Sequence, residues 1–276
     1  MTTKPEVGPL PLRRPAADEP AAPAAPRTIY RRPDLLSAQP TSYCPGCGHG
    51  IVHRLVAEVL EEMGVEGRTI LVGSVGCAVF AYDYLRLDAV ESPHGRAAAV
   101  ATGVKRVRPD RIVFTYQGDG DLAAIGTAEI VHAAARGERI TVIFVNNGIY
   151  GMTGGQMAPT TLKGMKTTTT PYGRDHIIEG HPMKMSEMLA LLDGVAYIER
   201  VPLSSPANIR RAKKAIARAF QMQLDKKGFS MVELLSPCPT NWKMSPVQSW
   251  KWAEEEMAKV FPPGVYKDVT ESKNAD

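Results

Sequence analysis

The sequence predicts an α/β fold, with a mostly parallel sheet flanked by helices. Two apolar runs, 111–116 and 140–145, have the length of buried strands, and the helix-length segment 122–136 separates them. Both runs lead into polar, glycine-rich loops. In an open α/β sheet such loops lie at one edge, where ligands bind. The chain is therefore expected to place a ligand site after these two strands.

The same patterns predict the other elements. Residues 1–40 are rich in proline and alanine, so we expect a flexible arm, which either lies on a partner or has no role. Residues 41–262 are expected to form the folded domain, and 263–276 a polar tail. Further strands are predicted at 69–72, 195–201 and 229–235, the last of the sheet, and further helices at 51–63, 97–105, 184–192, 206–224 and 249–260.

Composition narrows the class of protein. Apolar residues make up 44% of the chain and charged residues 22%, as in ordinary globular proteins. The net charge of +4 is spread out, without a basic block interleaved with aromatic residues, so we expect no nucleic-acid partner. We expect no membrane partner either, because no apolar run reaches membrane-spanning length. Without a signal-peptide pattern, the expected location is cytoplasmic.

The loops after the first two strands carry oxygen ligands. Asp119 lies between two glycines, and Asn146 and Asn147 end the second strand. A carboxylate, an amide oxygen and a backbone carbonyl suit Mg²⁺, which ligand phosphates complete. The helix that starts at 122 aims free N–H groups at the same place, which suits an anion. This arrangement, in which GDG is followed by one helix and then by NN, resembles the thiamine diphosphate (TPP) motif. The alternative interpretation is a helix between two strands with polar turns that bind no cofactor.

The chain has four cysteines, Cys44, Cys47, Cys77 and Cys238, and each lies in a loop beside glycine or proline. This favours a common site over four unrelated core thiols. Four thiolates suit either Zn²⁺ or an iron–sulfur cluster. Because zinc accepts no electrons, a nearby TPP site favours a [4Fe–4S] cluster. The long loop after Gln156 is expected to act as a lid over this site.

Six motifs occur in an order that resembles a known family: CPGCGHG, GVGC, HGR, GDGDLAAIG, NNGIYGMTGGQ and SPCPTNW. Over residues 40–245 the chain resembles the β subunit of 2-oxoacid:ferredoxin oxidoreductases, of the 2-oxoglutarate or branched-chain type. The resemblance implies a TPP diphosphate-binding domain that works with an α subunit. It also implies oxidative decarboxylation of a 2-oxoacid to CO₂ and, with coenzyme A, acyl-CoA, while electrons pass singly through the cluster to ferredoxin.

The resemblance also implies roles for individual residues. The cluster ligands would be Cys44, Cys47, Cys77 and Cys238, and the Mg²⁺ ligands Asp119, Asn147 and the carbonyl of Ile149. His94 would be a catalytic histidine of the TPP pocket, and His49 would lie beside the cluster loop and face the diphosphate. The remaining cofactor contacts would be Val75, Gly76, Cys77, Ala78, Gly118, Gly120, Asp121, Gly151 and Met152.

One position departs from the pattern of some members. They have a lysine in YGLTKGQ where this chain has Gly154. Where that lysine helps to bind the substrate, its loss removes a positive charge and permits a branched-chain or aryl 2-oxoacid. Three other readings fit parts of the sequence: a non-oxidative TPP decarboxylase or carboligase, a non-catalytic iron–sulfur or zinc scaffold subunit, and a generic nucleotide-binding α/β protein. The first does not need the four cysteines, the second does not need the Mg²⁺–diphosphate ligands, and the third leaves the cysteines unexplained.

Overall fold

A seven-stranded sheet forms the centre of the computed structural model, which describes residues 28–270. In spatial order its strands are β2 (Asp88–Glu91), β1 (Thr69–Gly73), β3 (Ile112–Gly118), β4 (Thr141–Asn146), β8 (Phe229–Leu235), β7 (Val195–Pro202) and β9 (Gly264–Asp268). Each pairing is parallel except that of β9 with β7. The predicted α/β fold with a mostly parallel sheet is thus confirmed.

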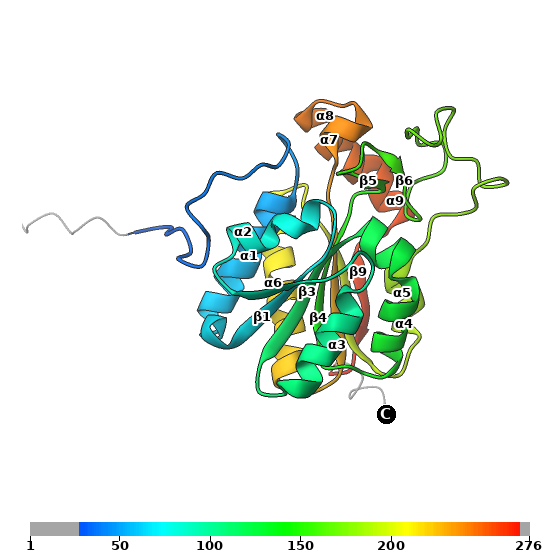
Figure 1. Cartoon of the computed structure of the whole chain (residues 1–276). Coiled ribbons are helices and arrows are strands. Elements are labelled where there is room, and N and C mark those ends of the chain that lie inside the picture. Colours follow the sequence, from blue (N-terminus) through cyan, green and yellow to red (C-terminus); the bar gives the residue numbers. More distant parts are fainter. Residues whose placement is uncertain (1–27, 271–276) are drawn as a thin grey trace, which may run out of the picture. The chain divides into compact units, whose positions relative to one another are not determined.

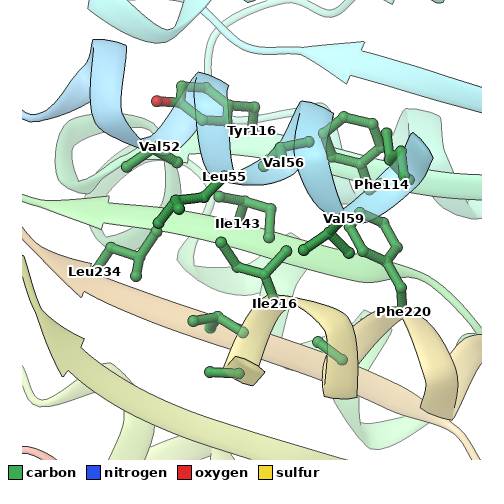
Figure 2. Close-up of a cluster of buried hydrophobic side chains, with 14 of the residues drawn as sticks. Val52, Leu55, Val56, Val59, Phe114, Tyr116, Ile143, Ile216, Phe220 and Leu234 are labelled. Carbon is green, nitrogen blue, oxygen red and sulfur yellow. The ribbon is translucent and has the colours of Figure 1, made fainter. Parts of the chain in front are cut away.

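Helices cover both faces of the sheet (Figure 1). On one face lie α1 (His49–Glu62) and α6 (Pro206–Leu224), whose apolar side chains meet those of β3, β4 and β8. Figure 2 shows this packing, with Val52 and Leu55 of α1 and Ile216 of α6 close to Ile143 of the sheet. The other face is covered by α3 (Ala97–Val107), α4 (Thr127–Ala135) and α5 (Met185–Ala190). A helical layer on each face is the usual way in which a parallel sheet is buried.

Smaller elements gather where the strands end. They are η2 (Cys77–Phe80), α2 (Ala81–Tyr84), the hairpin of β5 (Ile149–Tyr150) and β6 (Gln156–Met157), α7 (Pro239–Trp242), α8 (Pro246–Trp252), η4 (Ala253–Met257) and α9 (Ala258–Val260). Ile149, Trp242, Met257 and Phe261 form a third apolar cluster among them. A short turn, η1 (Glu66–Arg68), precedes β1.

Local capping explains the starts of two helices. At α6, Ser205 accepts a hydrogen bond from the backbone N–H of Asn208 at 3.2 Å, and Pro206 occupies the first turn. At α8, Ser245 and Gln248 form a capping box, again followed by proline. A side-chain acceptor satisfies a free N–H group, and proline lacks the N–H that would otherwise be unpaired there.

Strand register brings the loops together. Gly73 at the end of β1 pairs with Tyr116 of β3, Gly118 at the end of β3 pairs with Val145 of β4, and Asn146 pairs with Leu235 at the end of β8. The segments that follow β1, β3, β4 and β8 therefore leave the sheet at one edge. Most of the candidate site residues were predicted in these segments; His94 follows β2, and Cys44 and Cys47 precede α1.

The predicted helix 122–136 is not continuous. A π-helical turn, η3 (Gly120–Ile125), precedes α4, and Gly126 separates them, its N–H bonding the carbonyl of Asp121 at 2.8 Å. A Cβ on Gly126 would lie 2.6 Å from the carbonyl oxygens of both Asp121 and Gly95, so only glycine fits. The π turn is a local feature of the kind often found at functional sites.

The predicted domain boundaries differ from those of the structure. Most of the expected arm, residues 1–27, lies outside the described residues, but the compact unit begins at Pro33, and Leu35 is buried in its core. At the other end of the chain, Gly264–Asp268 form β9 and pair with the sheet. The polar tail expected from residue 263 therefore begins with a strand, and 229–235 is not the last strand of the sheet in sequence order. Among residues 28–270 no helix combines the length and apolarity needed to span a bilayer.

Candidate cofactor-binding site

One pocket at the carboxyl edge of the sheet contains all thirteen residues predicted for TPP and Mg²⁺. They come from the segments after β1, β2, β3 and β4. His49, at the start of α1, lines the pocket too, as do Tyr150 and Thr153, which were not predicted. The structure thus brings these residues together, while the role of each stays a prediction.

Asp119 is one of two buried carboxylates in the pocket, with 2% of its surface exposed. It accepts hydrogen bonds from the N–H groups of Gly120 and Ile149, each at 3.1 Å, and from the hydroxyl of Thr160 at 2.7 Å. Burial raises its pKa to about 6, although these hydrogen bonds act in the opposite direction. None of the ion pairs within residues 28–270 includes Asp119. A buried carboxylate with neutral partners is suited to a metal cation.

The β4–β5 turn supplies the other oxygen atoms expected to bind Mg²⁺. Asn147 is 7% exposed, and its Oδ1 accepts a 3.3 Å hydrogen bond from the N–H of Ile149. Its backbone carbonyl accepts the indole N–H of Trp242 at 3.1 Å, which fixes the turn against α7. Asn146, by contrast, does not line the pocket and points to Glu233 at 2.8 Å. Only one of the two asparagines is therefore placed to reach a ligand here.

Asp121 holds the segment after β2 in place. Its carboxylate accepts the N–H of Gly95 and the amide of Gln117, each at 2.7 Å, and burial raises its pKa. His94 Nε2 lies 3.8 Å from Asp121 Oδ1, and the imidazole is 29% exposed at the pocket. Gly120 is needed beside it, because a Cβ there would lie 2.3 Å from the ring of Tyr150. The pocket therefore combines a partly exposed imidazole, that of His94, with carboxylates that backbone N–H groups hold in place.

An aromatic cluster supports the wall formed by α1. His49 Nδ1 and the Tyr116 hydroxyl are 2.8 Å apart, and the Tyr43 ring stacks on His49 with centroids 4.8 Å apart. The Tyr43 hydroxyl donates to the carbonyl of Cys77 at 3.1 Å. Burial lowers the pKa of His49 to about 4, so the ring is neutral at pH 7. Tyr43 and Tyr116 were not predicted as site residues, since they contact the pocket only through their neighbours.

The four cysteines converge beside this pocket. None is in a disulfide, and Cys77 itself lines the pocket. Burial, together with the charges that the other three thiolates would carry, raises the pKa of Cys47 to about 12. A Cβ on Gly151 would lie 3.4 Å from Cys77 Sγ and 3.6 Å from Cys238 Sγ. Cys47, Cys77 and Cys238 are partly buried and Cys44 is exposed. A neighbourhood of thiols at the edge of the pocket fits a polynuclear iron–sulfur group, which would replace the protons by iron.

Asn241 links the thiols to the pocket. Its side-chain amide donates to the carbonyl of Gly151 at 2.9 Å and to Cys238 Sγ at 3.2 Å. Within residues 28–270, no group of three or more His, Cys, Asp or Glu side chains is placed to hold a metal ion. Cluster ligation by the four cysteines therefore stays a prediction.

The expected lid does not cover the pocket. Of the loop from Met157 onward, Thr160 reaches the site through Asp119, but the pocket lining within residues 28–270 ends at Thr153. Arg174 instead binds the loop together, donating to the carbonyls of Pro159, Thr161 and His181 among others. Thr160 has no sequence signal, because it is one of several threonines in an irregular segment.

Comparison with known proteins identifies the class. Residues 74–234 match the family described as the C-terminal TPP binding domain of thiamine pyrophosphate enzymes. A parallel sheet with this pocket at its carboxyl edge is thus a TPP-binding domain.

The relatives define the family further. The chain is 48% identical over 252 residues to ketoisovalerate oxidoreductase subunit VorA of Methanothermobacter thermautotrophicus, covering 88% of this chain and 53% of that protein. It is 40% identical over 216 residues to 2-oxoglutarate synthase subunit KorB of Methanocaldococcus jannaschii, covering 78% of this chain and 74% of that protein. The chain belongs to the 2-oxoacid:ferredoxin oxidoreductase family, as its motifs predicted. It spans about half the length of the VorA relatives that it matches.

A solved structure agrees with this assignment. It is 2-oxoglutarate:ferredoxin oxidoreductase from Magnetococcus marinus with 2-oxoglutarate, coenzyme A and succinyl-CoA bound. The TM-score is 0.69 at 27% identity, over 87% of this chain and 85% of that one. The similarity therefore extends over most of both chains.

Proposed function

We propose that this chain is the TPP-binding subunit of a 2-oxoacid:ferredoxin oxidoreductase. In the proposed reaction a 2-oxoacid and coenzyme A become acyl-CoA and CO₂, and two electrons leave singly through a [4Fe–4S] cluster to ferredoxin. The observation that supports this best is the position of Gly151, which lines the cofactor pocket and where an added Cβ would lie within 3.6 Å of two of the four thiols. A non-oxidative TPP enzyme has no use for thiols at this point.

The pocket residues suit the cofactor. When bound, TPP would supply the electron sink that lets a 2-oxoacid lose CO₂. Asp119, Asn147 and the Ile149 carbonyl would hold Mg²⁺ and, through it, the diphosphate. His94, partly exposed and 3.8 Å from Asp121, would hold or move a proton at its Nε2 atom. The close packing of Gly120 against Tyr150 would keep water from that wall.

The thiols and a partner would complete the enzyme. Cys44, Cys47, Cys77 and Cys238 would hold the cluster, and Cys44 is the exposed one of the four. The pocket is open at the surface, where His94 and Met152 remain accessible. We propose that a second, α subunit closes it, since the longer VorA relatives contain about twice the matched length. A reducing cytoplasm would keep the thiols available for iron.

The proposed substrate is a branched-chain 2-oxoacid. Gly154 adjoins Thr153 of the pocket, and a Cβ at Gly154 would meet open space. Where some family members carry a lysine, this chain therefore has neither a cation nor bulk. The relative that is 48% identical is named a ketoisovalerate oxidoreductase, which supports the same substrate class.

The test uses the chain purified together with its partner subunit. Iron and acid-labile sulfide would be measured, and ferredoxin reduction would be followed with TPP, Mg²⁺, coenzyme A and a panel of 2-oxoacids that includes ketoisovalerate and 2-oxoglutarate. We expect about four iron atoms per chain and the highest kcat/KM with ketoisovalerate. Cys44→Ser, Cys77→Ser and Cys238→Ser should each lower the iron content. TPP-dependent CO₂ release by an iron-free complex would instead establish the non-oxidative alternative.

A further inference from the structure

A second hollow lies at the opposite, amino-terminal edge of the sheet. It has a volume of about 340 Å³ and lies where η1, α3 and α6 end and where β3 begins. From Ile112 in this hollow to Gly118 in the cofactor pocket, β3 extends about 20 Å at roughly 3.3 Å per residue. A ligand here is therefore separate from the TPP site.

The lining of the hollow is strongly basic. Its cations are Arg68, Lys105, Arg111, Arg139 and Lys226, and its one carboxylate is Asp110. Asp110 already pairs with Arg108 at 3.0 Å and with Arg111 at 3.2 Å. Among the ion pairs of the described chain, none includes Arg68, Arg139 or Lys226. Five cations against one carboxylate leave a formal excess of four positive charges.

Lys105 is a buried cation of this lining. It is 8% exposed, and its ammonium donates to the backbone carbonyls of Pro109 and Arg111. Burial, followed by the positive charge of Arg139, lowers the pKa of Lys105 to about 8. An anion bound in the hollow would favour the charged form of Lys105 and so oppose both effects.

Helix ends explain only part of the excess. Basic residues are favoured at helix carboxyl ends, each of which is equivalent to about half a negative charge. The two helices that end here, α3 and α6, therefore offset about one of the four positive charges. Arg68 and Arg139 lie instead just before β1 and β4. Their convergence on a concave surface needs another reason.

We infer that this hollow binds a small anion that carries two or more phosphate groups. Guanidinium groups form paired, charge-assisted hydrogen bonds with phosphate oxygens, and lysine adds a point charge. No aromatic side chain lines the hollow, so recognition would come from the phosphates rather than from stacking on a base. The ligand would act as an effector or stabiliser, because the reacting atoms lie at the other edge of the sheet.

The test is a calorimetric titration of the full chain, in its complex, with inorganic pyrophosphate. Saturating TPP and Mg²⁺ are present throughout, so that the diphosphate position of the cofactor pocket is filled. The double variant Arg139→Gln/Lys226→Gln changes exposed side chains and should leave folding intact. We expect it to bind pyrophosphate about tenfold more weakly, or worse, through loss of charge-assisted bonds.

A matched control removes the same net charge elsewhere. Arg210→Gln/Lys214→Gln changes two exposed cations of α6 outside the hollow and should retain the parent affinity. Absence of pyrophosphate binding by the parent complex would overturn the inference, as would equal weakening in the two double variants. Binding of a duplex oligonucleotide but not of pyrophosphate would also overturn it. The titration does not depend on the 2-oxoacid reaction, so its result is separable from that of the proposed function.

Discussion

Replacement of Glu233 by alanine should destabilise the protein and loosen the β4–β5 turn, which carries the proposed Mg²⁺ ligand Asn147. Glu233 and Arg200 are both fully buried, with Arg200 Nε 2.8 Å from Glu233 Oε2. Removing one member of a buried ion pair leaves an uncompensated charge, which typically lowers the free energy of unfolding by about 3–5 kcal/mol. Arg200 keeps its pair with Glu187, which is 32% exposed, so we expect the lower end, about 3 kcal/mol.

The same substitution affects the cofactor site through Asn146. Its amide donates to Glu233 at 2.8 Å, and its Oδ1 accepts the N–H of Gly148 at 3.2 Å. Without Glu233 the amide lacks a buried acceptor, and the turn that carries Asn147 loses a fixed neighbour. We therefore expect weaker Mg²⁺-dependent TPP binding as well as lower stability.

Urea unfolding and TPP titration at several Mg²⁺ concentrations measure the two effects. Glu199→Gln is the control, since Glu199 is a buried acid on neighbouring β7 whose partner, Arg211, lies outside the cofactor site. It should lower stability by less than Glu233→Ala and leave TPP affinity unchanged. A loss below about 0.5 kcal/mol for Glu233→Ala, within the range of ordinary surface changes, would refute the reasoning. Unchanged TPP affinity would refute the link through Asn146.

Three further changes test separate parts of the structure. Asp119→Asn preserves the side-chain shape but removes the charge. The affinity for TPP should therefore no longer depend on Mg²⁺, while the urea midpoint stays near that of the parent; an affinity that still depends on Mg²⁺ would contradict the ligand assignment. Asn241→Leu removes the N–H donor 3.2 Å from Cys238 Sγ, and a redox titration followed by electron paramagnetic resonance should give a more negative cluster potential. An unchanged potential would show that this donor does not tune the cluster. Gly103→Ala, at an exposed position inside α3 where a Cβ meets open space, should raise the free energy of unfolding by about 0.5–1 kcal/mol; destabilisation would mean that α3 tolerates no side chain there.

The strands that the sequence predicted are those with a strong apolar signal. Each residue of β4 and of β8 is buried, and apolar residues predominate in both strands, which identifies them. Strand β2 was missed because all four of its residues are exposed. Strand β9 was missed because its own sequence has no strand pattern. It is extended because it pairs with β7, which is far away in sequence. Edge strands thus depend on tertiary contacts that a local pattern does not contain.

The site follows the same division. Residues directly after a predicted strand, such as Asp119 and Cys77, were found because parallel strands bring their ends to one edge. Thr160 and Asn241 were not assigned a role, because each acts only through a hydrogen bond to a predicted site residue. Thr160 bonds Asp119, 41 positions away, and Asn241 bonds Cys238, 3 positions away. The break at Gly126 was also missed, because it arises from close contact with Gly95 rather than from helix propensity.

The position of two thiols beside Gly151 supports the proposed oxidative chemistry over the non-oxidative alternative more directly than any single motif. Decarboxylation alone requires a cofactor pocket and a proton carrier, and in the proposed function the segments around Asp119 and His94 would provide both. Oxidation requires in addition that an electron acceptor lie beside the pocket. Here Gly151 lines the pocket, and a Cβ built on it would be in ordinary van der Waals contact with Cys77 Sγ and Cys238 Sγ. Two thiols therefore lie against the pocket wall, which decarboxylation alone does not require, and their position supports the proposed electron transfer to a cluster held there.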